Sequence, residues 1–227
     1  MTDSPSHHSE IDSVLSKLLL ATSNSAIDFD SIIDANHKAG LPAIDVSPLQ
    51  GKLLQLLVQI SAAKRVLEIG TLGGYSTAWM ATGLPEGGRV TTVEVNATHA
   101  GVAASNLKEA GLADRVTLRL GQAAKILDEM INDDVDPFDF VFIDADKPSG
   151  VTYFEAAMKL TRPGSVVVCD NVVRSGQILD LETDDPDVIG TQQLLRRIAD
   201  EPRVCATAIQ TVGQKGHDGF AIVRVNS

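Results

Sequence analysis

The strongest constraint on the fold is the stretch Val66–Ser76, V-L-E-I-G-T-L-G-G-Y-S. An apolar run that ends in a glycine cluster is typical of a buried strand leading into a tight turn, and the segment Ser76–Met80 continues as a predicted helix. Glycines in the turn let the backbone take positive φ or approach a ligand closely. The helix N-terminus presents unpaired N–H groups to an electron-rich ligand. The stretch therefore predicts a strand, loop and helix that cradle a nucleotide-like cofactor.

The spacing of this loop argues against a dinucleotide. Dinucleotide enzymes use the turn G-x-G-x-x-G, whereas this loop is G-x-x-G-G with Glu68 near the end of the strand. A carboxylate beneath the loop would repel a diphosphate but suits a ligand with an amino group or a sulfonium centre, and S-adenosylmethionine has both. Glu94 ends the next predicted strand, where such folds place a carboxylate on ribose hydroxyls. A nicotinamide-dependent oxidoreductase is disfavoured because its phosphate turn is missing.

Strand-like and helix-like runs alternate after the loop. The further predicted strands are Val90–Val95, Val116–Leu120, Phe138–Ile143, Ser165–Cys169, Val204–Ile209 and Phe220–Val225. This alternation predicts a mostly parallel sheet with helices on both faces. The link G-Q-K-G-H-D-G between the last two strands is too short for a crossover helix, so these strands must pair antiparallel. The expected fold class is α/β, a Rossmann-like seven-stranded sheet with one antiparallel strand.

The 227 residues are expected to form a single domain. Residues 63–227 would form the cofactor-binding core, residues 10–62 extra N-terminal helices, and residues 1–9 a disordered tail in which His7 and His8 are solvated. The predicted N-terminal helices are Ile11–Leu20, Ser31–Ala39 with Asp30 as cap and Gly40 at its end, and a helix from Ser47 and Pro48 whose apolar stripe is Leu49, Leu53, Leu57 and Ile60.

The composition limits partners and compartment. A net charge of −11 argues against nucleic acid or an anionic membrane as the main partner and favours a small-molecule substrate. Cys169 and Cys205 lie in apolar stretches, which predicts buried free thiols in a reducing compartment. The first residues lack the pattern of a signal peptide, and no apolar run approaches membrane-spanning length. These features predict a cytoplasmic protein.

Polar residues end each predicted parallel strand, which is where open α/β sheets bind ligands. These strand ends are Glu68-Ile69-Gly70, Glu94, Gly121-Gln122-Ala123, Asp144 and Asp170-Asn171. The oxygen donors of Asp144, Asp170 and Asn171 suit a divalent cation, for which magnesium is the natural choice. The alternative is that Asp170 and Asn171 cap the following turn while Asp144 pairs with Lys147.

Lys147 lies three positions after Asp144, close enough to share its site. A lysine beside a dication in a partly desolvated cleft loses its proton more readily and can then accept one from a substrate. The alternative is a surface ion pair. Asp146 either orients Lys147 or caps the next helix.

Four blocks of sequence extend this interpretation to a family. They are V-L-E-I-G-T-L-G-G-Y-S, V-T-T-V-E-V, F-V-F-I-D-A-D-K and V-V-V-C-D-N-V-V-R-S-G. With these blocks in this order, residues 44–225 resemble the class I, metal-dependent O-methyltransferases of the catechol and caffeoyl-coenzyme A type. The resemblance implies the same sheet, a homodimer, and methyl transfer from S-adenosylmethionine to a hydroxyl of a small aromatic, catechol-like acceptor.

The resemblance also assigns roles to residues. Asp144, Asp170 and Asn171 match the ligands of Mg²⁺, or of another divalent cation such as Mn²⁺ or Ca²⁺, and Lys147 with Asp144 match the catalytic residues. Lys147 would take the proton of a metal-chelated hydroxyl, and the oxyanion would attack the methyl group. The expected cofactor-binding residues are Val46, Glu68, Gly70, Gly74, Tyr75, Ser76, Glu94, Gln122, Ala123 and Asp144.

The sequence departs from the family pattern after D-A-D-K. Many relatives continue with a polar residue, Asn and Tyr, whereas Pro148, Ser149 and Gly150 stand here, which predicts a roomier substrate wall. No particular acceptor is therefore carried over. The aromatic residues considered for stacking on the substrate are Phe29, Trp79 and Tyr153.

Other features leave alternatives open. Arg174 would meet an anionic substituent of the substrate or pair with the acidic segment Asp180–Asp187, which is expected to be a solvated loop or else a lid. The alternative functions are an O-methyltransferase for a different natural-product hydroxyl and a non-catalytic S-adenosylmethionine-binding protein. An intact set of Asp144, Lys147, Asp170 and Asn171 disfavours the second, because a binding protein needs no metal site.

Overall fold

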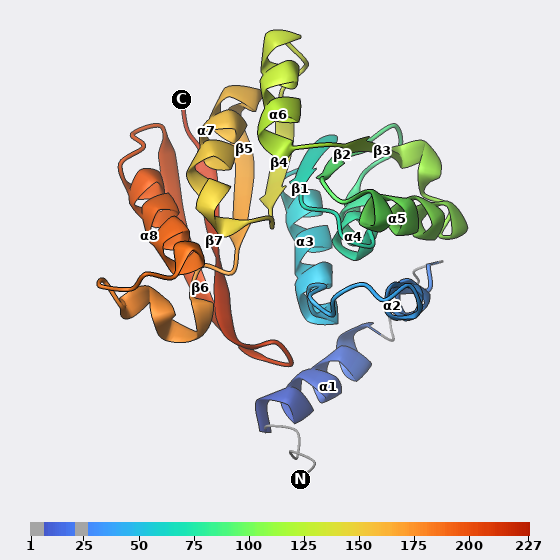
Figure 1. Ribbon diagram of the computed structural model, residues 1–227. Helices are drawn as coiled ribbons and strands as arrows, with labels where there is room; N and C mark the ends of the chain where they lie inside the picture. Colours follow the sequence, from blue (N-terminus) through green and yellow to red (C-terminus); the bar gives the residue numbers. More distant parts are fainter. Residues whose placement is uncertain (1–6, 21–26) are drawn as a thin grey trace.

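The computed structural model describes residues 7–20 and 27–227, which fold around a seven-stranded sheet with helices on both faces (Figure 1). The strand order is β3-β2-β1-β4-β5-β7-β6. The strands are β1 (Arg65–Ile69), β2 (Arg89–Glu94), β3 (Val116–Leu120), β4 (Phe138–Ile143), β5 (Thr161–Asp170), β6 (Val204–Gly213) and β7 (Gly216–Val225). Neighbouring strands are parallel except where β7 pairs with β5 and β6. The predicted class and the reversed strand are confirmed.

The helices are α1 (His7–Leu20), α2 (Phe29–Lys38), α3 (Pro48–Ile60), α4 (Tyr75–Gly83), α5 (Ala97–Glu109), α6 (Ala123–Asn132), α7 (Gly150–Leu160) and α8 (Pro186–Ala199), with short 3₁₀ turns η1 (Ala113–Arg115), η2 (Lys147–Ser149) and η3 (Arg174–Leu179). The helices α2 to α8 form two layers, one on each face of the sheet, while α1 lies against α3 and β6 with no buried residue. Val66 of β1 packs with the core of α2 to α5, whereas Leu67 packs with that of α6 to α8. Because successive strand residues face opposite sides, each central strand serves both cores.

The N-terminal helices begin earlier than predicted. α1 starts at His7, so the prediction of a disordered tail is wrong for residues 7–9, while residues 1–6 lie outside the described residues. α2 starts at Phe29, and its cap is Asp28, not Asp30. The reason is geometric, because the Asp28 side chain accepts from Ser31 N at 3.2 Å, the bond that an N-cap side chain makes.

α3 starts as predicted after Ser47, but it presents a different face to the core. The predicted stripe is only partly buried, and its last member, Ile60, is 79% exposed. Gly51 and Val58 are buried instead. A Cβ atom on Gly51 would lie 2.3 Å from Trp79 Cδ1, so the glycine allows α3 to lie directly against α4.

Trp79 and Phe29 belong to the core between α2 and α4. Their rings are stacked with centroids 3.6 Å apart, and both side chains are buried. The rings are therefore in contact with each other and not available to an aromatic acceptor. Of the three aromatic residues considered for stacking on the substrate, the structure leaves Tyr153.

The two cysteines are free, as predicted, but only one is buried. Burial raises the pKa of the Cys169 thiol to about 12. Cys205 is exposed, so the prediction of its burial is wrong, because β6 lies at the edge of the sheet and most of its side chains face outward. Within residues 7–20 and 27–227, no helix has the length and apolar character needed to cross a membrane.

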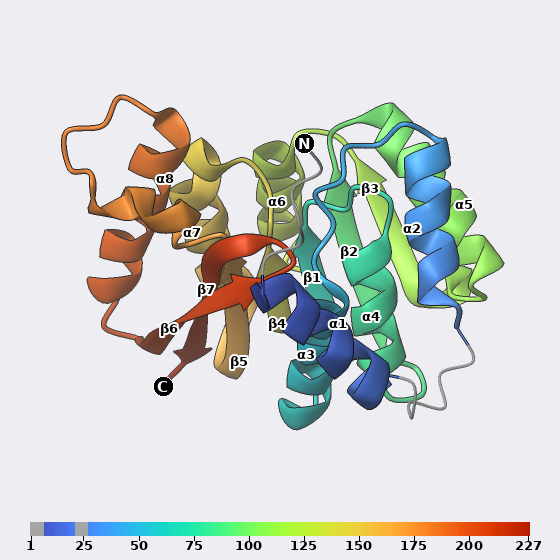
Figure 2. The same cartoon turned by 90° about the horizontal axis from the view of Figure 1, so that it is seen from below.

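The β6–β7 hairpin is longer than predicted. Only Gln214 and Lys215 form its turn, so most of the expected G-Q-K-G-H-D-G link is strand. The hairpin extends beyond the sheet toward α1 (Figure 2). Gln214 N donates to Asp12 Oδ2 of α1 at 2.8 Å, and Lys215 Nζ donates to Ala43 O at 3.1 Å. The hairpin thereby joins the C-terminal strands to two N-terminal segments.

We expect Gly51→Ala to lower the free energy of unfolding by about 1–3 kcal/mol, because the added methyl group must displace the packed Trp79 ring. The matched control is Gly101→Ala in α5, where a Cβ atom meets nothing within 4 Å. The control should raise stability by about 0.5–1 kcal/mol, the usual advantage of alanine over glycine in a helix. Urea denaturation followed by circular dichroism measures both, and equal effects would contradict the close packing of α3 on α4.

Candidate active site

The carboxyl ends of β1, β2, β4 and β5 border one cavity of about 830 Å³, a size typical of small-molecule sites. It lies at the switch point between β1 and β4, because the chain continues from β1 to β2 on one side and from β4 to β5 on the other, the usual ligand position in open α/β sheets. Most of the predicted site residues line it: Val46, Gly70, Ser76, Glu94, Gln122, Ala123, Asp144, Lys147, Asp170 and Asn171.

The first turn of α4 reaches the cavity through Ser76 rather than through its two preceding residues. Tyr75 is 2% exposed, and its ring makes edge contacts with Phe29 and Trp79 at centroid distances of 6.1 and 6.3 Å. Gly74 caps the helix with φ 85° and faces α5. The structure therefore does not bring Gly74 or Tyr75 into the cavity wall, and their expected contact with the cofactor stays a prediction.

Glu68 is also absent from the cavity wall, because it points into the core with no exposed surface. Its carboxylate accepts from Ser76 Oγ at 2.5 Å, from Thr92 Oγ1 at 2.7 Å and from Thr77 Oγ1. Burial raises the pKa of Glu68 to about 7, since the cost of desolvating the charge exceeds what the three hydroxyl donors return. Glu68 thus fixes the position of Ser76, which does line the cavity.

Glu94 ties the glycine loop to the end of β2. One carboxylate oxygen accepts from Thr71 N at 3.2 Å and Leu72 N at 2.9 Å, and the other accepts from Asn96 N at 2.9 Å. His99 Nδ1 lies 3.7 Å from the second oxygen. These backbone donors compensate a carboxylate that is only 7% exposed, and they hold it at the cavity.

A buried amide network connects the glycine loop to α2 and to the segment that carries Val46. Asn36 Nδ2 donates to Asp45 Oδ1 at 2.9 Å, and Asn106 Nδ2 donates to Asn36 Oδ1 and to Gly73 O, each at 2.9 Å. A Cβ atom on Gly73 would lie 1.8 Å from Asn36 Oδ1, so glycine is needed at this contact. The network places Val46 opposite the loop.

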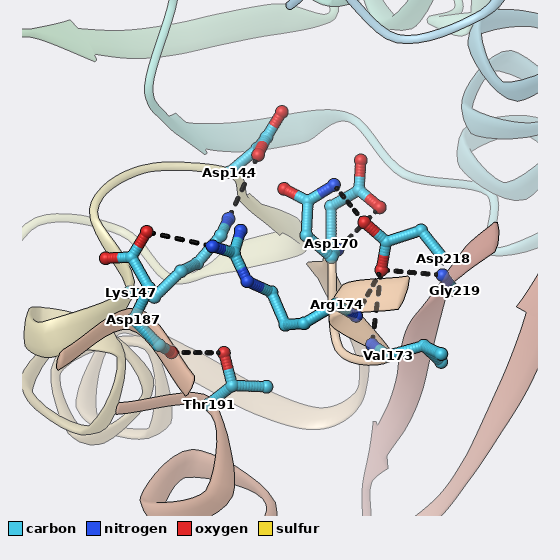
Figure 3. A network of polar contacts seen from close by, with 10 residues as sticks. Asp144, Lys147, Asp170, Val173, Arg174, Asp187, Thr191, Asp218 and Gly219 are labelled. Atoms are coloured by element: carbon cyan, nitrogen blue, oxygen red, sulfur yellow. Dashed lines mark hydrogen bonds and ion pairs between the residues drawn. The ribbon is translucent and has the colours of Figure 1, made fainter. Parts of the chain in front are cut away.

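Asp144 and Asp170 bring two carboxylates to the other side of the cavity, from the ends of β4 and β5 (Figure 3). Lys147 Nζ donates to Asp144 Oδ1 at 3.2 Å. Asp170 is 6% exposed, and burial together with the negative charge of Asp144 raises its pKa to about 7. The ionised form of Asp170 is therefore disfavoured, and the site favours an added positive charge.

Asp218, which the sequence analysis did not single out, organises the backbone beside these acids (Figure 3). Its Oδ1 accepts from Val173 N at 3.2 Å, from Arg174 N at 3.1 Å and from Gly219 N at 2.9 Å. Its Oδ2 accepts from Asn171 Nδ2 at 3.2 Å. A carboxylate can only accept, so this bond fixes the amide orientation and leaves Asn171 Oδ1 without that partner.

Three oxygen-bearing side chains thus line the predicted metal position: Asp144, Asp170 and Asn171. Among residues 7–20 and 27–227 there is no cluster of three or more His, Cys, Asp and Glu side chains arranged for a metal. The predicted set contains only two such residues, since its third member is an amide. Hard oxygen donors, two of them acidic, fit a Mg²⁺-like cation that keeps open positions for water or substrate.

Asp146 caps the turn η2, which settles the two alternatives for this residue. Its Oδ2 accepts from Ser149 N at 3.2 Å, and its Oδ1 accepts from Tyr153 Oη at 2.5 Å. Burial and the hydrogen bond to Asp146 raise the pKa of Tyr153 to about 12, so this ring enters the cavity as a neutral phenol. The divergent Pro148–Gly150 segment forms this turn and the start of α7.

The acidic segment 180–187 does not form a simple loop along its whole length. Asp185 caps α8, and Asp187 lies in the first turn of that helix. Arg174 Nη2 lies 2.9 Å from Asp187 Oδ2, so the predicted ion pair with the acidic segment is present. Arg174 nevertheless lines the cavity, whereas Asp187 does not.

The cavity wall includes further polar residues that sequence reasoning missed: Gln50, His99, Thr211, Lys215 and Asp218. The antiparallel pairing of β7 with β5 is the signal that could have located Asp218. Asp170 pairs with Phe220 in the antiparallel register, so a residue shortly before Phe220 must lie just beyond Asp170.

Residues 22–225 match the protein-family model described as O-methyltransferase. A catechol O-methyltransferase of Mycobacterium tuberculosis is 50% identical over 191 residues, which cover 84% of this chain and 85% of that protein.

Two solved structures have the same fold. The O-methyltransferase from Bacillus cereus in complex with SAH has a TM-score of 0.93 at 50% identity, covering 96% of this chain and 98% of that one. TomG from Streptomyces achromogenes, involved in tomaymycin synthesis and solved in complex with SAM, has a TM-score of 0.92 at 41% identity and covers 100% of both chains.

We expect Glu68 to make stability depend on pH. Because its folded pKa, about 7, lies above the ordinary value of 4.5, the folded state binds a proton that the unfolded state lacks between these values, and the free energy of unfolding falls as pH rises through this window. In Glu68→Gln, the free energy of unfolding should decrease by up to about 3 kcal/mol less over this pH window. Urea denaturation between pH 5 and pH 8 without cofactor measures it.

The control for this prediction is Glu86→Gln, which alters an exposed acid. Its stability profile should run parallel to that of the wild type. A Glu68→Gln profile that is also parallel would contradict a neutral, buried carboxyl group.

Proposed function

The chain belongs to the O-methyltransferase family, and on that premise we propose that it transfers a methyl group from S-adenosylmethionine to a hydroxyl of a small, catechol-like aromatic acceptor with the help of a divalent cation. One observation carries the proposal. Asp144, Asp170, Asn171 and Lys147 line the same cavity as the glycine loop and Glu94. The cofactor residues and the residues of the reaction thus share one space.

The cofactor would lie along the wall formed by the first half of the chain. Glu94 would accept from the ribose hydroxyls, since backbone N–H groups already hold its carboxylate at the cavity. Gln122 and Ala123, after β3, would border the adenine, and Ser76 would donate to the methionine carboxylate. When bound, S-adenosylmethionine supplies an electrophilic methyl group.

A divalent cation would be held by Asp144, Asp170 and Asn171. When bound, it supplies positive charge that favours the ionised form of an acceptor hydroxyl. Asp218 would orient the Asn171 amide so that its oxygen is the ligand atom, which makes Asp218 a positioning residue. Magnesium suits this set of oxygen donors, as manganese or calcium also do.

Lys147 would hold the proton released by the acceptor hydroxyl at its Nζ atom. Its side chain is 13% exposed, and Asp144 Oδ1, 3.2 Å away, positions the amine at the cavity. Partial exclusion of water strengthens the electrostatic interactions there, and correct placement of both reactants lowers the barrier further.

A second candidate acceptor is a hydroxyl on a larger natural-product scaffold. The similarity to TomG, which is involved in tomaymycin synthesis, supports this alternative. Among the cavity-lining residues that the structure describes, Tyr153 is the one aromatic side chain, so the wall is not specialised for stacking on a flat ring. A non-catalytic binding protein is disfavoured, because such a protein needs neither Lys147 nor a metal site.

The homodimer and the cytoplasmic location stay predictions. Ile11, Val14, Leu15 and Leu18 of α1 are exposed apolar residues, as are Ile209 and Val212 of the neighbouring strand β6, which supports a dimer through this face. Sedimentation velocity decides between monomer and dimer.

We expect Glu94→Gln to weaken S-adenosylmethionine binding by about tenfold or more, because the carboxylate would lose charge-assisted bonds to the ribose. Isothermal titration calorimetry measures the affinity. Glu86→Gln is the control and should bind S-adenosylmethionine like the wild type. Its thermal unfolding shows whether loss of a carboxylate alone changes the stability of the protein. Unchanged affinity in Glu94→Gln would remove Glu94 from the cofactor site.

We expect chelation with EDTA to abolish methyl transfer to caffeic acid and added Mg²⁺ to restore it. Asp170→Asn should lower kcat/KM by about 100-fold, because one anionic ligand is lost, yet it should still bind S-adenosylmethionine. Asp128→Asn, on the exposed side of α6, is the matched control. Full activity in EDTA or in Asp170→Asn would overturn the metal-dependent mechanism.

A further inference from the structure

The backbone conformation at Arg174 determines the position of this residue at the cavity. Its φ is 54°, and Ser175 and Gly176 follow with φ of 55° and 85°. Left-handed conformations are strained in non-glycine residues and persist only where other contacts impose them. Asp218 imposes this one by accepting from the N–H groups of Val173 and Arg174. The same carboxylate thus fixes both Asn171 and Arg174.

The guanidinium group of Arg174 has donors left over. Nη2 bonds to Asp187 Oδ2 at 2.9 Å (Figure 3), and Asp187 does not line the cavity. Nε is buried and closed to a ligand in this conformation, whereas Nη1 is not buried and makes no hydrogen bond in the described part of the chain. A guanidinium carries five N–H donors in a planar fork, so pairing with Asp187 leaves a second edge for another acceptor group.

The other cations of the cavity have different partners. Among the described residues that line it, the lysines and arginines are Lys147, Arg174 and Lys215. Lys147 pairs with Asp144, a predicted metal ligand, and Lys215 donates to Ala43 O on the segment leading to Val46. Among these three, Arg174 is therefore the cation that neither pairs with a predicted metal ligand nor bonds to the segment leading to Val46.

We propose that Arg174 is a specificity-determining residue that binds a carboxylate substituent of the acceptor, so that the preferred substrates are anionic catechols. This inference rests on the proposed function. A protein of net charge −11 disfavours anionic ligands at long range, so an anionic acceptor requires a local cation within the cavity. Arginine suits this task, because its fork matches the two oxygens of a carboxylate. Asp187 would hold the guanidinium in place when no acceptor is bound.

The competing role is purely structural. In that case Arg174 would serve only to clamp η3 to α8 through Asp187, and its Nη1 donors would have no ligand. The two roles predict different substrate dependence. A clamp affects all acceptors alike, whereas a carboxylate-binding residue affects only the charged ones strongly.

The test uses two matched pairs of acceptors with S-adenosylmethionine and Mg²⁺. The pairs are 3,4-dihydroxyphenylacetate with its methyl ester and caffeate with its methyl ester, which present the same rings with and without a charge at two lengths. The measured quantity is the ratio of kcat/KM for the acid to that for the ester. The enzymes are the full-length wild type, Arg174→Gln, Arg174→Lys and Asp187→Asn.

The wild type should prefer the acid in at least one pair by about tenfold. Arg174→Gln should lose that preference through a higher KM for the acid, and Arg174→Lys should keep part of it because the charge remains. Asp187→Asn should equal or exceed the wild-type ratio, since it removes the competing carboxylate but not the cation. These outcomes would support the assignment.

Three results would overturn it. One is a wild type that prefers the ester in both pairs. Another is a ratio that Arg174→Gln leaves unchanged, and the third is a parallel loss of activity on acid and ester in Arg174→Gln and Asp187→Asn, which identifies a clamp. A wild type that methylates none of the four acceptors would instead overturn the proposed catechol function, and this assignment with it.

Discussion

The crowding of acids at one edge of the sheet is the constraint on which the site depends. Glu68, Glu94, Asp144, Asp170 and Asp218 all gather around the carboxyl ends of the strands, and clustered carboxylates are costly unless each is compensated. Backbone N–H groups compensate Glu94 and Asp218, whereas the hydroxyl groups around Glu68 compensate its burial only in part. Asp144 and Asp170 have fewer donors, with Lys147 as the nearby cation. The predicted metal position is therefore next to the two acids that the protein's own donors compensate least.

Much of the fold and of this edge could be predicted from the sequence, because both follow from local pattern. Apolar runs separated by helical segments define a parallel sheet, and a polar residue directly after such a run must lie at the carboxyl end. That logic located Glu94, Asp144 and Asp170 correctly in the cavity wall. It did not locate Asp218, whose place depends on the antiparallel register of β7 against β5.

The remaining errors arise from tertiary packing. Glu68 alternates with Leu67 and Ile69 and shares a face with Val66, so the pleat of β1 turns it into the core instead of the cavity. Cys205 belongs to an apolar run, but its strand lies at an edge, where one face stays exposed. The buried side of α3 follows its close packing on α4, where Gly51 meets Trp79 and Val58 meets Gly83, which no periodicity in the helix itself reveals.

The cavity wall divides cleanly along the chain. Residues from Ala43 to Ala124 form the side assigned to the cofactor, and residues from Asp144 to Asp218 form the side assigned to metal and acceptor, with no lining residue between them. A single recombination point in α6 or β4 would therefore separate two gene segments with different tasks. New acceptor specificity can evolve by exchange or drift in the second segment while the first is kept, so the methyl-donor half can serve many chemistries without redesign.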